Sequence, residues 1–272
     1  MTTDFFDLGD RMKAYEAQTT SQRLIPLLPV VARIDGRAFH SFTKGMVRPF
    51  DVRFRNCMLA TTLHLVKETG ARVGYTQSDE ISLGWYLEGI GEQMWFDGKV
   101  FKIISGLAAS ATSAFQACCR DSLPEYADLS PTFDARVWNV PNLDEAVNAF
   151  LWRERDAVKN SVSALASCHF SDKELFGKST AERRTMLEEK GVRWEDFPYY
   201  FKRGSYVRKY KTTAPFTTTE LESLPEKHAA RLDPNLQVER SRISIGEIPP
   251  LSKILNQVGT LFYGVEPTDI QE

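Results

Sequence analysis

Two aspartates stand at the ends of apolar, strand-like runs in this chain. Asp35 follows the run at 28–32, and Asp79 follows the run at 73–75. Two carboxylates on neighbouring strands, beside a tight glycine-containing turn, suit a pair of divalent metal ions that handles a nucleoside triphosphate. Asp-Gly after a strand and Ser-Asp-Glu at the head of a hairpin are also ordinary turn sequences. Their placement in a common fold decides between these two interpretations.

The residues after Asp35 suit a phosphate group. Gly36 lets the backbone approach an ion closely, and the successive N–H groups from Arg37 to His40 can cradle a triphosphate. Arg48 lies nearby in the sequence and can neutralise phosphate oxygens. Phe39 is expected to pack in the core. For His40, a hydrogen bond to phosphate or to the sheet is expected rather than a catalytic role.

Asp79 is the natural second metal ligand, with Ser78 and Glu80 beside it. Side chains alternate along a strand, so Asp79 and Glu80 are expected on opposite faces and Glu80 is the weaker candidate. The sequence contains neither Gly-x4-Gly-Lys-Ser/Thr nor Gly-x-Gly-x-x-Gly, which disfavours P-loop and Rossmann enzymes.

The elements around these residues follow the order strand, helix, strand, strand, helix, strand. This order predicts an α+β fold of the ferredoxin-like, split βαβ type, with a polymerase-palm-type sheet. The same architecture serves polymerase palms, nucleotidyl cyclases and RNA-binding domains, so it does not define an activity. Because its first and third strands are neighbours, it would place Asp35 beside Asp79. The expected elements are strands at 28–34, 71–76, 81–86 and 133–140, and helices from Asp51 to Gly70 and from about 98 to 120.

Beyond residue 140 the pattern is mainly helical, with helices expected at about 142–168 and 179–190. In the first of these, Arg153, Glu154 and Arg155 suit a solvated helix face at least as well as a functional role. The segment 199–211 interleaves cations with aromatics, which suits either an RNA contact or a plain exposed strand. The last sixty residues are expected to be irregular.

The predicted organisation is therefore a palm-like catalytic core with an amphipathic N-terminal helix at 1–140. A helical and irregular extension at 141–272 is expected to pack on this core, so that the chain forms one continuous unit.

The composition is that of an ordinary globular protein. The chain has 272 residues, 42% hydrophobic and 26% charged, with a formal net charge of −2. That charge excludes a polybasic protein but allows a local basic groove for a nucleic acid. The four cysteines show no metal-type spacing, and neither a signal-peptide pattern nor a membrane-length apolar run is evident. Reduced thiols, a cytoplasmic location and no membrane contact are therefore expected.

Taken together, these motifs resemble the tRNA-His guanylyltransferase family, whose members add nucleotides in the 3′–5′ direction. The chain looks closest to the bacterial, archaeal and phage-type branch of tRNA-repair-like members. The resemblance covers roughly residues 8 to 211. The matching pieces are 33–40, 48–51, 75–80, Lys102, 133–136, Trp152-Arg153 with Asp156 and Asn160, and 202–205.

The resemblance implies that Asp35, the Gly36 carbonyl and Asp79 hold two Mg²⁺ ions, with ATP and GTP as substrates. It also implies a tRNA partner and a homotetramer. The residues around the nucleotide would be Arg37, Ala38, Phe39, His40, Arg48, Asp51, Ser78 and Lys102. Weaker candidates for RNA binding or activation are Arg33, Glu80, Asn160, Lys202, Arg203 and Ser205.

The chain departs from the eukaryotic members on the helix after Trp152. They carry a His-Ile-Asn-Asn-like signature, whereas residues 158–161 are Val-Lys-Asn-Ser, and only Asn160 persists. This favours template-dependent repair of 5′-truncated tRNAs over addition of G-1 to tRNA-His. Arg48 stands where the eukaryotic pattern has lysine, which keeps the charge but changes its geometry.

Two other functions stay open on the sequence alone. A nucleotidyl cyclase shares the palm and an acidic pair, but its usual Gly-Gly-Asp/Glu-Glu/Asp-Phe-like hairpin is absent. A non-catalytic RNA-binding module of ferredoxin-like fold needs exposed aromatics on its central strands, and the first strand, at 29–33, offers none.

Overall fold

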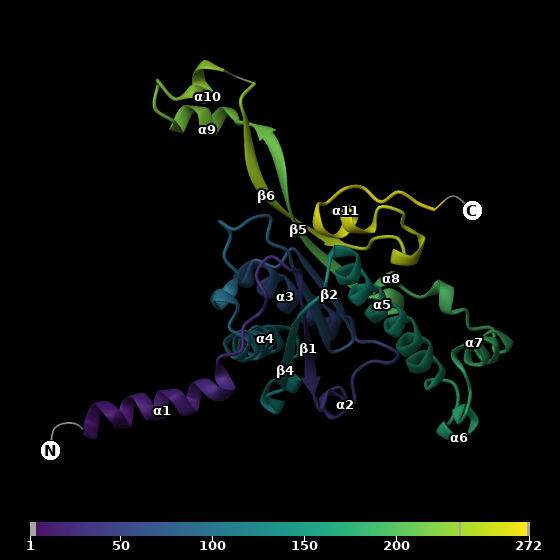
Figure 1. The fold of residues 1–272 in the computed structure, drawn as a ribbon. Helices are drawn as coiled ribbons and strands as arrows, with labels where there is room; N and C mark the ends of the chain where they lie inside the picture. Colours follow the sequence, from purple (N-terminus) through teal and green to yellow (C-terminus); the bar gives the residue numbers. More distant parts are fainter. Residues whose placement is uncertain (1–3, 234, 271–272) are drawn as a thin grey trace.

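The structure, a computed structural model, describes residues 4–233 and 235–270. A six-stranded antiparallel sheet runs through the described chain in the order β4-β1-β3-β2-β5-β6 (Figure 1). Its strands are β1 (Val30–Arg37), β2 (Val73–Gln77), β3 (Glu80–Trp85), β4 (Thr132–Asn139), β5 (Ser205–Pro215) and β6 (Gln237–Gly246).

Helices cover both faces of this sheet. The long helices α3 (Val52–Thr69) and α4 (Val100–Ser122) lie on one face, while α5 (Leu143–Ala166) and α11 (Gln257–Phe262) lie on the other (Figure 1). Strand alternation explains the two layers. On β1, Ile34 belongs to the core with α3 and α4, whereas Val31 belongs to the core with α5 and α11.

The remaining helical segments are short, apart from the N-terminal helix α1 (Asp4–Thr20) and α7 (Thr180–Glu189). A third apolar cluster joins the end of α5 to the segments that follow it. No described helix is long and apolar enough to cross a membrane. The short segments are α2 (Phe39–Phe42), α6 (Asp172–Leu175), α8 (Tyr199–Arg203), α9 (Thr218–Ser223), α10 (Ala229–Leu232), and 3-10 turns at Trp95–Gly98, Pro124–Leu129, Trp194–Asp196 and Leu251–Lys253.

Local signals in the sequence account for the boundaries of the long helices. The Asp51 carboxylate accepts a hydrogen bond from the Arg53 N–H at 2.9 Å and caps α3, which ends at Gly70 with φ of 73°. Asn142 caps α5 in the same way, by accepting from the Glu145 N–H at 2.9 Å. The predicted order of elements from β1 to β4 is confirmed.

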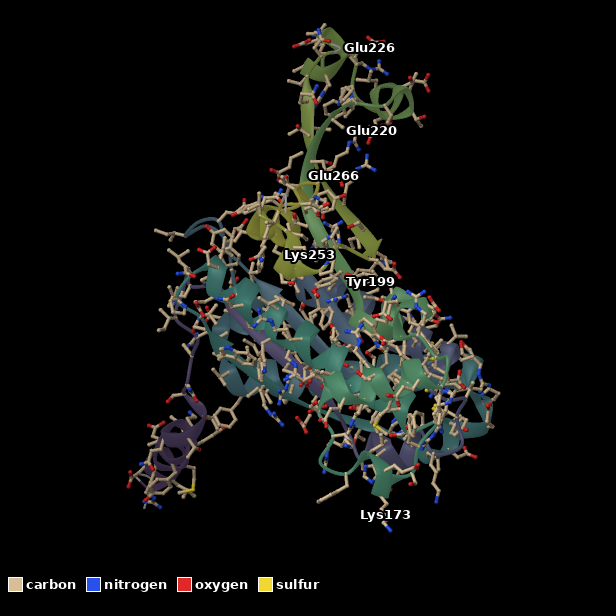
Figure 2. All side chains as sticks on the ribbon, turned by 90° about the vertical axis from the view of Figure 1, so that its right-hand side faces the viewer. Lys173, Tyr199, Glu220, Glu226, Lys253 and Glu266 are labelled. Carbon is tan, nitrogen blue, oxygen red and sulfur yellow. The ribbon has the colours of Figure 1, made fainter. Side chains whose placement is uncertain are left out.

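The expectation of irregular structure in the last sixty residues is wrong. β6 pairs with β5 along its whole length, from Tyr206↔Gly246 to Pro215↔Gln237. The two strands leave the body as a ribbon that ends in α9 and α10, where Figure 2 shows Glu220 and Glu226. Every residue of β6 is at least partly exposed. No buried face therefore imposes the apolar alternation by which a strand is recognised.

The N-terminal segment is a helix, as predicted, but it does not pack on the body. α1 projects away from the sheet (Figure 1), and residues 7–20 are all exposed. The amphipathic pattern therefore does not correspond to a buried face within the described chain.

Candidate active site

Asp35 and Asp79 come together where β1 meets the turn between β2 and β3. The Gly36 N–H donates a hydrogen bond to the Asp79 carbonyl at 3.0 Å. Asp35 lies inside β1, opposite Glu80 on β3 and Asp134 on β4. Asp35-Gly36 was expected to form a turn after the strand. It lies within β1 instead, because pairing with β4 extends this strand to Arg37.

Gly36 is required by the close approach of an aromatic ring. A Cβ atom at this position would lie 2.3 Å from Cδ2 of Phe39. The Phe39 ring is buried and packs at 5.0 Å from the ring of Phe133 and 5.4 Å from that of Phe115, which confirms the predicted core role of Phe39. Ala38 takes φ of 55° between Gly36 and Phe39, so the chain reverses tightly into α2.

The turn that carries Asp79 holds its carboxyl group partly buried. Ser78 and Asp79 join β2 to β3 as a two-residue turn, with φ of 49° at Ser78. Burial raises the pKa of the Asp79 carboxyl, and the nearby Asp35 carboxylate raises it further. The Ser78 side chain and His40 act in the opposite direction. The structure thus brings Asp35, His40, Ser78 and Asp79 into one neighbourhood.

Glu80 is committed to an ion pair within the protein. Its carboxylate oxygens accept from Nε of Arg153 at 2.5 Å and from Nη2 of Arg153 at 2.7 Å. Arg153 also contacts Asp156 at 2.9 Å, so these three residues join β3 to α5. This pairing gives Glu80 a structural partner on α5, although Glu80 lies directly opposite Asp35 in the sheet.

Arg153 and Glu154 are both buried, so the interpretation as a solvated face is wrong for them. The Glu154 carboxylate accepts from Arg203 at 2.9 Å, from the Tyr206 hydroxyl at 3.3 Å and from the Leu251 N–H at 3.2 Å. Each buried charge is compensated by a residue distant in sequence, which helical periodicity does not reveal. Arg155 is exposed, which agrees with a solvated face.

Three candidate residues of the basic segment after residue 199 also have partners within the protein. Lys202 donates to the Glu195 carbonyl and lies over the Trp194 ring, Arg203 pairs with Glu154, and Ser205 accepts from Arg55 at 3.0 Å. The segment forms α8 and the start of β5, whose first residues Ser205 to Val207 are buried. The structure thus gives these side chains roles in the fold.

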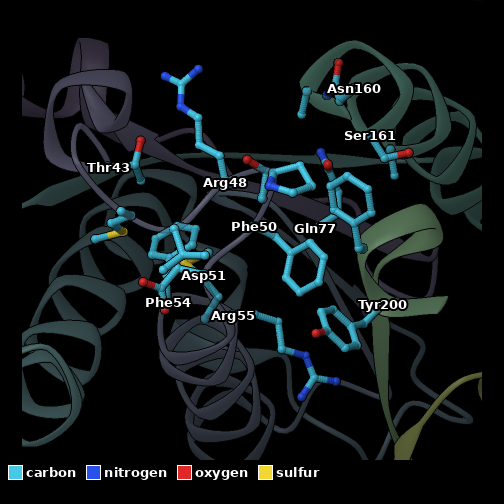
Figure 3. Close-up of a pocket in the computed structure, with 18 of the residues that line it drawn as sticks. Thr43, Arg48, Phe50, Asp51, Phe54, Arg55, Gln77, Asn160, Ser161 and Tyr200 are labelled. Carbon is cyan, nitrogen blue, oxygen red and sulfur yellow. The ribbon is translucent and has the colours of Figure 1, made fainter. Parts of the chain in front are cut away.

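A cavity of about 350 Å³ opens next to Ser78. Figure 3 shows Arg48, Phe50 and Asp51 along one side and Asn160 and Ser161 of α5 along another. A cavity of this size with apolar walls and a few polar groups is typical of small-ligand sites. The predicted site residues that line it are Arg48, Asp51, Ser78, Asn160 and Ser205. Its apolar wall includes Met46, Phe50, Phe54, Met58, Tyr200 and Phe201.

Arg55 lines the same cavity, and nothing in the sequence indicated it. Its guanidinium lies 4.5 Å from the Tyr200 ring centre and donates to Ser205, while its buried Nε finds no partner in the described chain. An arginine in the first turns of a helix gives no local sign of such a position. Gln77 of β2 reaches the cavity as well.

The other predicted residues lie outside this cavity wall, among them the cations Lys102, Arg37 and Arg33. Lys102 is exposed in the first turn of α4, and Arg37 is exposed at the end of β1. Arg33 lies on the sheet, with its Nε 4.0 Å from a Glu80 oxygen and its guanidinium 5.8 Å from the Trp152 ring centre.

Comparison with known proteins shows the family to which the chain belongs. A family model described as tRNAHis guanylyltransferase matches residues 9–141. A solved structure of a bacterial tRNA(His) guanylyltransferase-like protein in complex with ATP is 32% identical, with a TM-score of 0.77 over 94% of this chain and 99% of that chain. One in complex with GTP is also 32% identical, with a TM-score of 0.67 over 91% of this chain and 94% of that chain.

Among the curated relatives is the tRNA(His) guanylyltransferase of Schizosaccharomyces pombe. It is 28% identical over 67% of this chain and 74% of its own length. The protein is thus a nucleotidyltransferase. It belongs to the tRNA(His) guanylyltransferase family. This membership decides against the cyclase and the non-catalytic RNA-binding module.

Proposed function

We propose that the protein is a Mg²⁺-dependent 3′–5′ nucleotidyltransferase that adds nucleotides to the 5′ end of tRNA. In this proposal the first four strands work as a ferredoxin-like polymerase palm. The observation that carries it is the meeting of Asp35 and Asp79 beside a ligand-sized cavity. The similarity to guanylyltransferase-like proteins in complex with ATP and GTP supports nucleotides as substrates.

The donor set fits magnesium. Asp35, Asp79 and the Gly36 carbonyl offer only oxygen ligands, and the raised pKa of Asp79 reflects burial and the neighbouring Asp35 carboxylate, which a divalent cation would offset. Within the described residues, no three His, Cys, Asp or Glu side chains form a metal cage. Magnesium typically binds one or two carboxylates together with substrate phosphates, so a pair suffices. The bound metal would stabilise charge at the reacting phosphate.

The remaining residues bind and orient the nucleotide. The backbone from Arg37 to His40 would receive the triphosphate, with the cation of Lys102 as a further candidate contact. The cavity beside Ser78 would take the nucleoside, with Arg48 and Asp51 at its wall. The 5′-phosphate of the RNA would attack the α-phosphate of ATP or GTP, which releases pyrophosphate and leaves AMP or GMP joined to the 5′ end. The 3′-hydroxyl of the incoming nucleotide would then attack the RNA 5′-phosphate and expel that AMP or GMP. An RNA that already carries a 5′-triphosphate would release pyrophosphate in this second step.

Templated repair of 5′-truncated tRNA is the favoured activity. Asn160 lines the cavity from α5, and the residues around it differ from the His-Ile-Asn-Asn-like signature of eukaryotic members. A site without that signature lacks the feature associated with non-templated addition of G-1 to tRNA-His.

The test is incubation with Mg²⁺, ATP and each labelled nucleoside triphosphate, using tRNAs that are intact or lack one 5′ nucleotide. We expect label at the 5′ end of the shortened tRNA, with the nucleotide set by the opposite base. Asp35→Asn and Asp79→Asn should each reduce incorporation by roughly 100- to 1,000-fold while the fold persists.

Asp10→Asn, on the exposed N-terminal helix, is the matched control and should retain full activity. Label added equally well to intact tRNA-His would favour G-1 addition. Undiminished activity in either active-site variant would refute the metal assignment.

A further inference from the structure

We propose that an exposed stripe of α5, made of Trp152, Arg155 and Lys159, docks the 5′-terminal nucleotides of the RNA beside the two aspartates. The proposal rests on the proposed function and deepens it, since it assigns a surface to the polynucleotide substrate rather than to the triphosphate. These three residues are called the α5 stripe.

The α5 stripe occupies one side of its helix. Residues spaced by three and four share a helical face, and the three side chains span about 10 Å along the axis. The opposite side of α5, with Phe150 and Ala157, is buried. Trp152 is 53% exposed, so about half of the residue's surface is open to solvent.

The α5 stripe begins next to the acidic pair. The Arg33 guanidinium lies 5.8 Å from the Trp152 ring centre, and Arg33 shares a face of β1 with Asp35. Arg153, which holds Glu80, lies 4.5 Å from the same ring centre. The buried Nε of Arg33 has no hydrogen-bond partner among the described residues. Arg33, whose Nε lies 4.0 Å from a Glu80 oxygen, and the exposed Trp152 ring therefore flank the candidate reaction site.

The charge of the α5 stripe is not neutralised by the protein. Arg155 and Lys159 are exposed, and neither forms an ion pair with any residue that the structure describes. The adjacent carboxylate, Asp156, is already bound to Arg153. The exposed Trp152 ring is therefore flanked along α5 by two cations without an ion pair among the described residues.

This combination matches the chemistry of a polynucleotide end. An exposed aromatic ring stacks on any base without reading its sequence, and neighbouring cations contact the phosphates that follow. The occupant would be the first nucleotides at the 5′ end, with a base on Trp152 and phosphates along Arg155 and Lys159. A substrate whose length or terminal base varies needs such a sequence-tolerant support.

The test is equilibrium binding of a 5′-truncated tRNA to the full chain without Mg²⁺ or nucleotide. Trp152→Ala should weaken binding by about 5- to 100-fold, and Trp152→Phe should restore part of it because a ring remains. The double variant Arg155→Glu/Lys159→Glu should weaken binding and lower the slope of log affinity against log salt by about 1 to 2.

The matched control substitutions are at one residue of α6 and one residue just after it. Phe176 is 88% exposed, and Lys173 is exposed at the end of the molecule opposite the β5–β6 ribbon (Figure 2). Phe176→Ala and Lys173→Glu should bind RNA as the wild type does. In turnover, Trp152→Ala should raise KM for RNA and leave kcat at saturating RNA, and KM for the nucleoside triphosphate, unchanged.

RNA binding by Trp152→Ala that equals the wild type would overturn the proposal, even if activity fell, because Trp152 would then act through Arg153 and Glu80. If Trp152→Ala bound RNA as the wild type does but had a different sedimentation mass, the α5 stripe would be assigned to contact between protein chains instead. A wild-type protein that binds truncated tRNA through Trp152 but incorporates no nucleotide would refute the proposed function alone.

Discussion

At the scale of single residues, the site depends on how closely the backbone after Asp35 approaches an aromatic ring. Gly36 and Phe39 are three residues apart, yet the ring lies where a Cβ atom would be. This contact sets the path of the backbone between β1 and α2. The N–H groups proposed to receive the triphosphate lie on that path.

Gly36→Ala should therefore destabilise the protein by about 1 to 3 kcal/mol, because the new Cβ overlaps the Phe39 ring in a packed core. Urea denaturation measures the free energy of unfolding. Gly9→Ala is the matched control, since a Cβ at Gly9 meets nothing within 4 Å, and in a helix it should be neutral or stabilising by up to about 1 kcal/mol. Equal effects of the two substitutions would contradict the role of the Gly36–Phe39 contact.

At the scale of elements, local chemistry explains most of what the sequence predicted. The Asp51 cap, the stop at Gly70 and the Ser78-Asp79 turn act within a few residues, so they are visible in the chain itself. β6 lacked such a signal because its residues are exposed on the ribbon. The burial of Arg153 and Glu154 was not predicted, because their partners Glu80 and Arg203 are distant in sequence.

The stability that the start of α3 contributes to the protein should depend on pH. Hydrogen bonds from the Arg53 side chain hold the pKa of Asp51 below its ordinary value of 3.8. A lowered pKa in the folded state contributes stability above the ordinary value, and that contribution is lost as pH falls through the folded pKa. Asp51→Ala should cost about 1 to 2 kcal/mol at neutral pH.

Asp51→Asn separates the cap from the charge. Asparagine still caps a helix but carries no charge, so its stability difference from the wild type should shrink below pH of about 4. Thermal unfolding across pH measures this. A difference that stayed constant with pH would show that the Asp51 charge does not stabilise α3.

At the scale of the whole molecule, one buried carboxylate links α5 to three later segments. Glu154 contacts Arg203 of α8, Tyr206 of β5 and the backbone of Leu251. β5 in turn pairs with β2, so residues beyond 140 complete the sheet formed before it. We propose on this basis that the chain unfolds as one unit.

Glu154→Ala should lower the free energy of unfolding by about 3 kcal/mol, because it leaves Arg203 and the Tyr206 hydroxyl without their acceptor. Calorimetry should show a single transition at a lower temperature. Glu189→Ala, an exposed position at the end of α7, should change stability by less than about 0.5 kcal/mol. Two separated transitions in the wild type would instead indicate independent domains.

Local patterns along the chain predict the elements from β1 to β4, the helix caps and the two aspartates as a candidate pair. They can do so because periodicity, capping and turn chemistry act over a few residues. The pairing of buried charges, the segments that wall the cavity and the position of β6 became visible only in the folded chain. The cavity draws on residues from Thr43 to Ser205, and its walls exist only after α5 and α8 pack beside α3. Contacts between residues that far apart depend on the whole packed chain, so no short pattern encodes them.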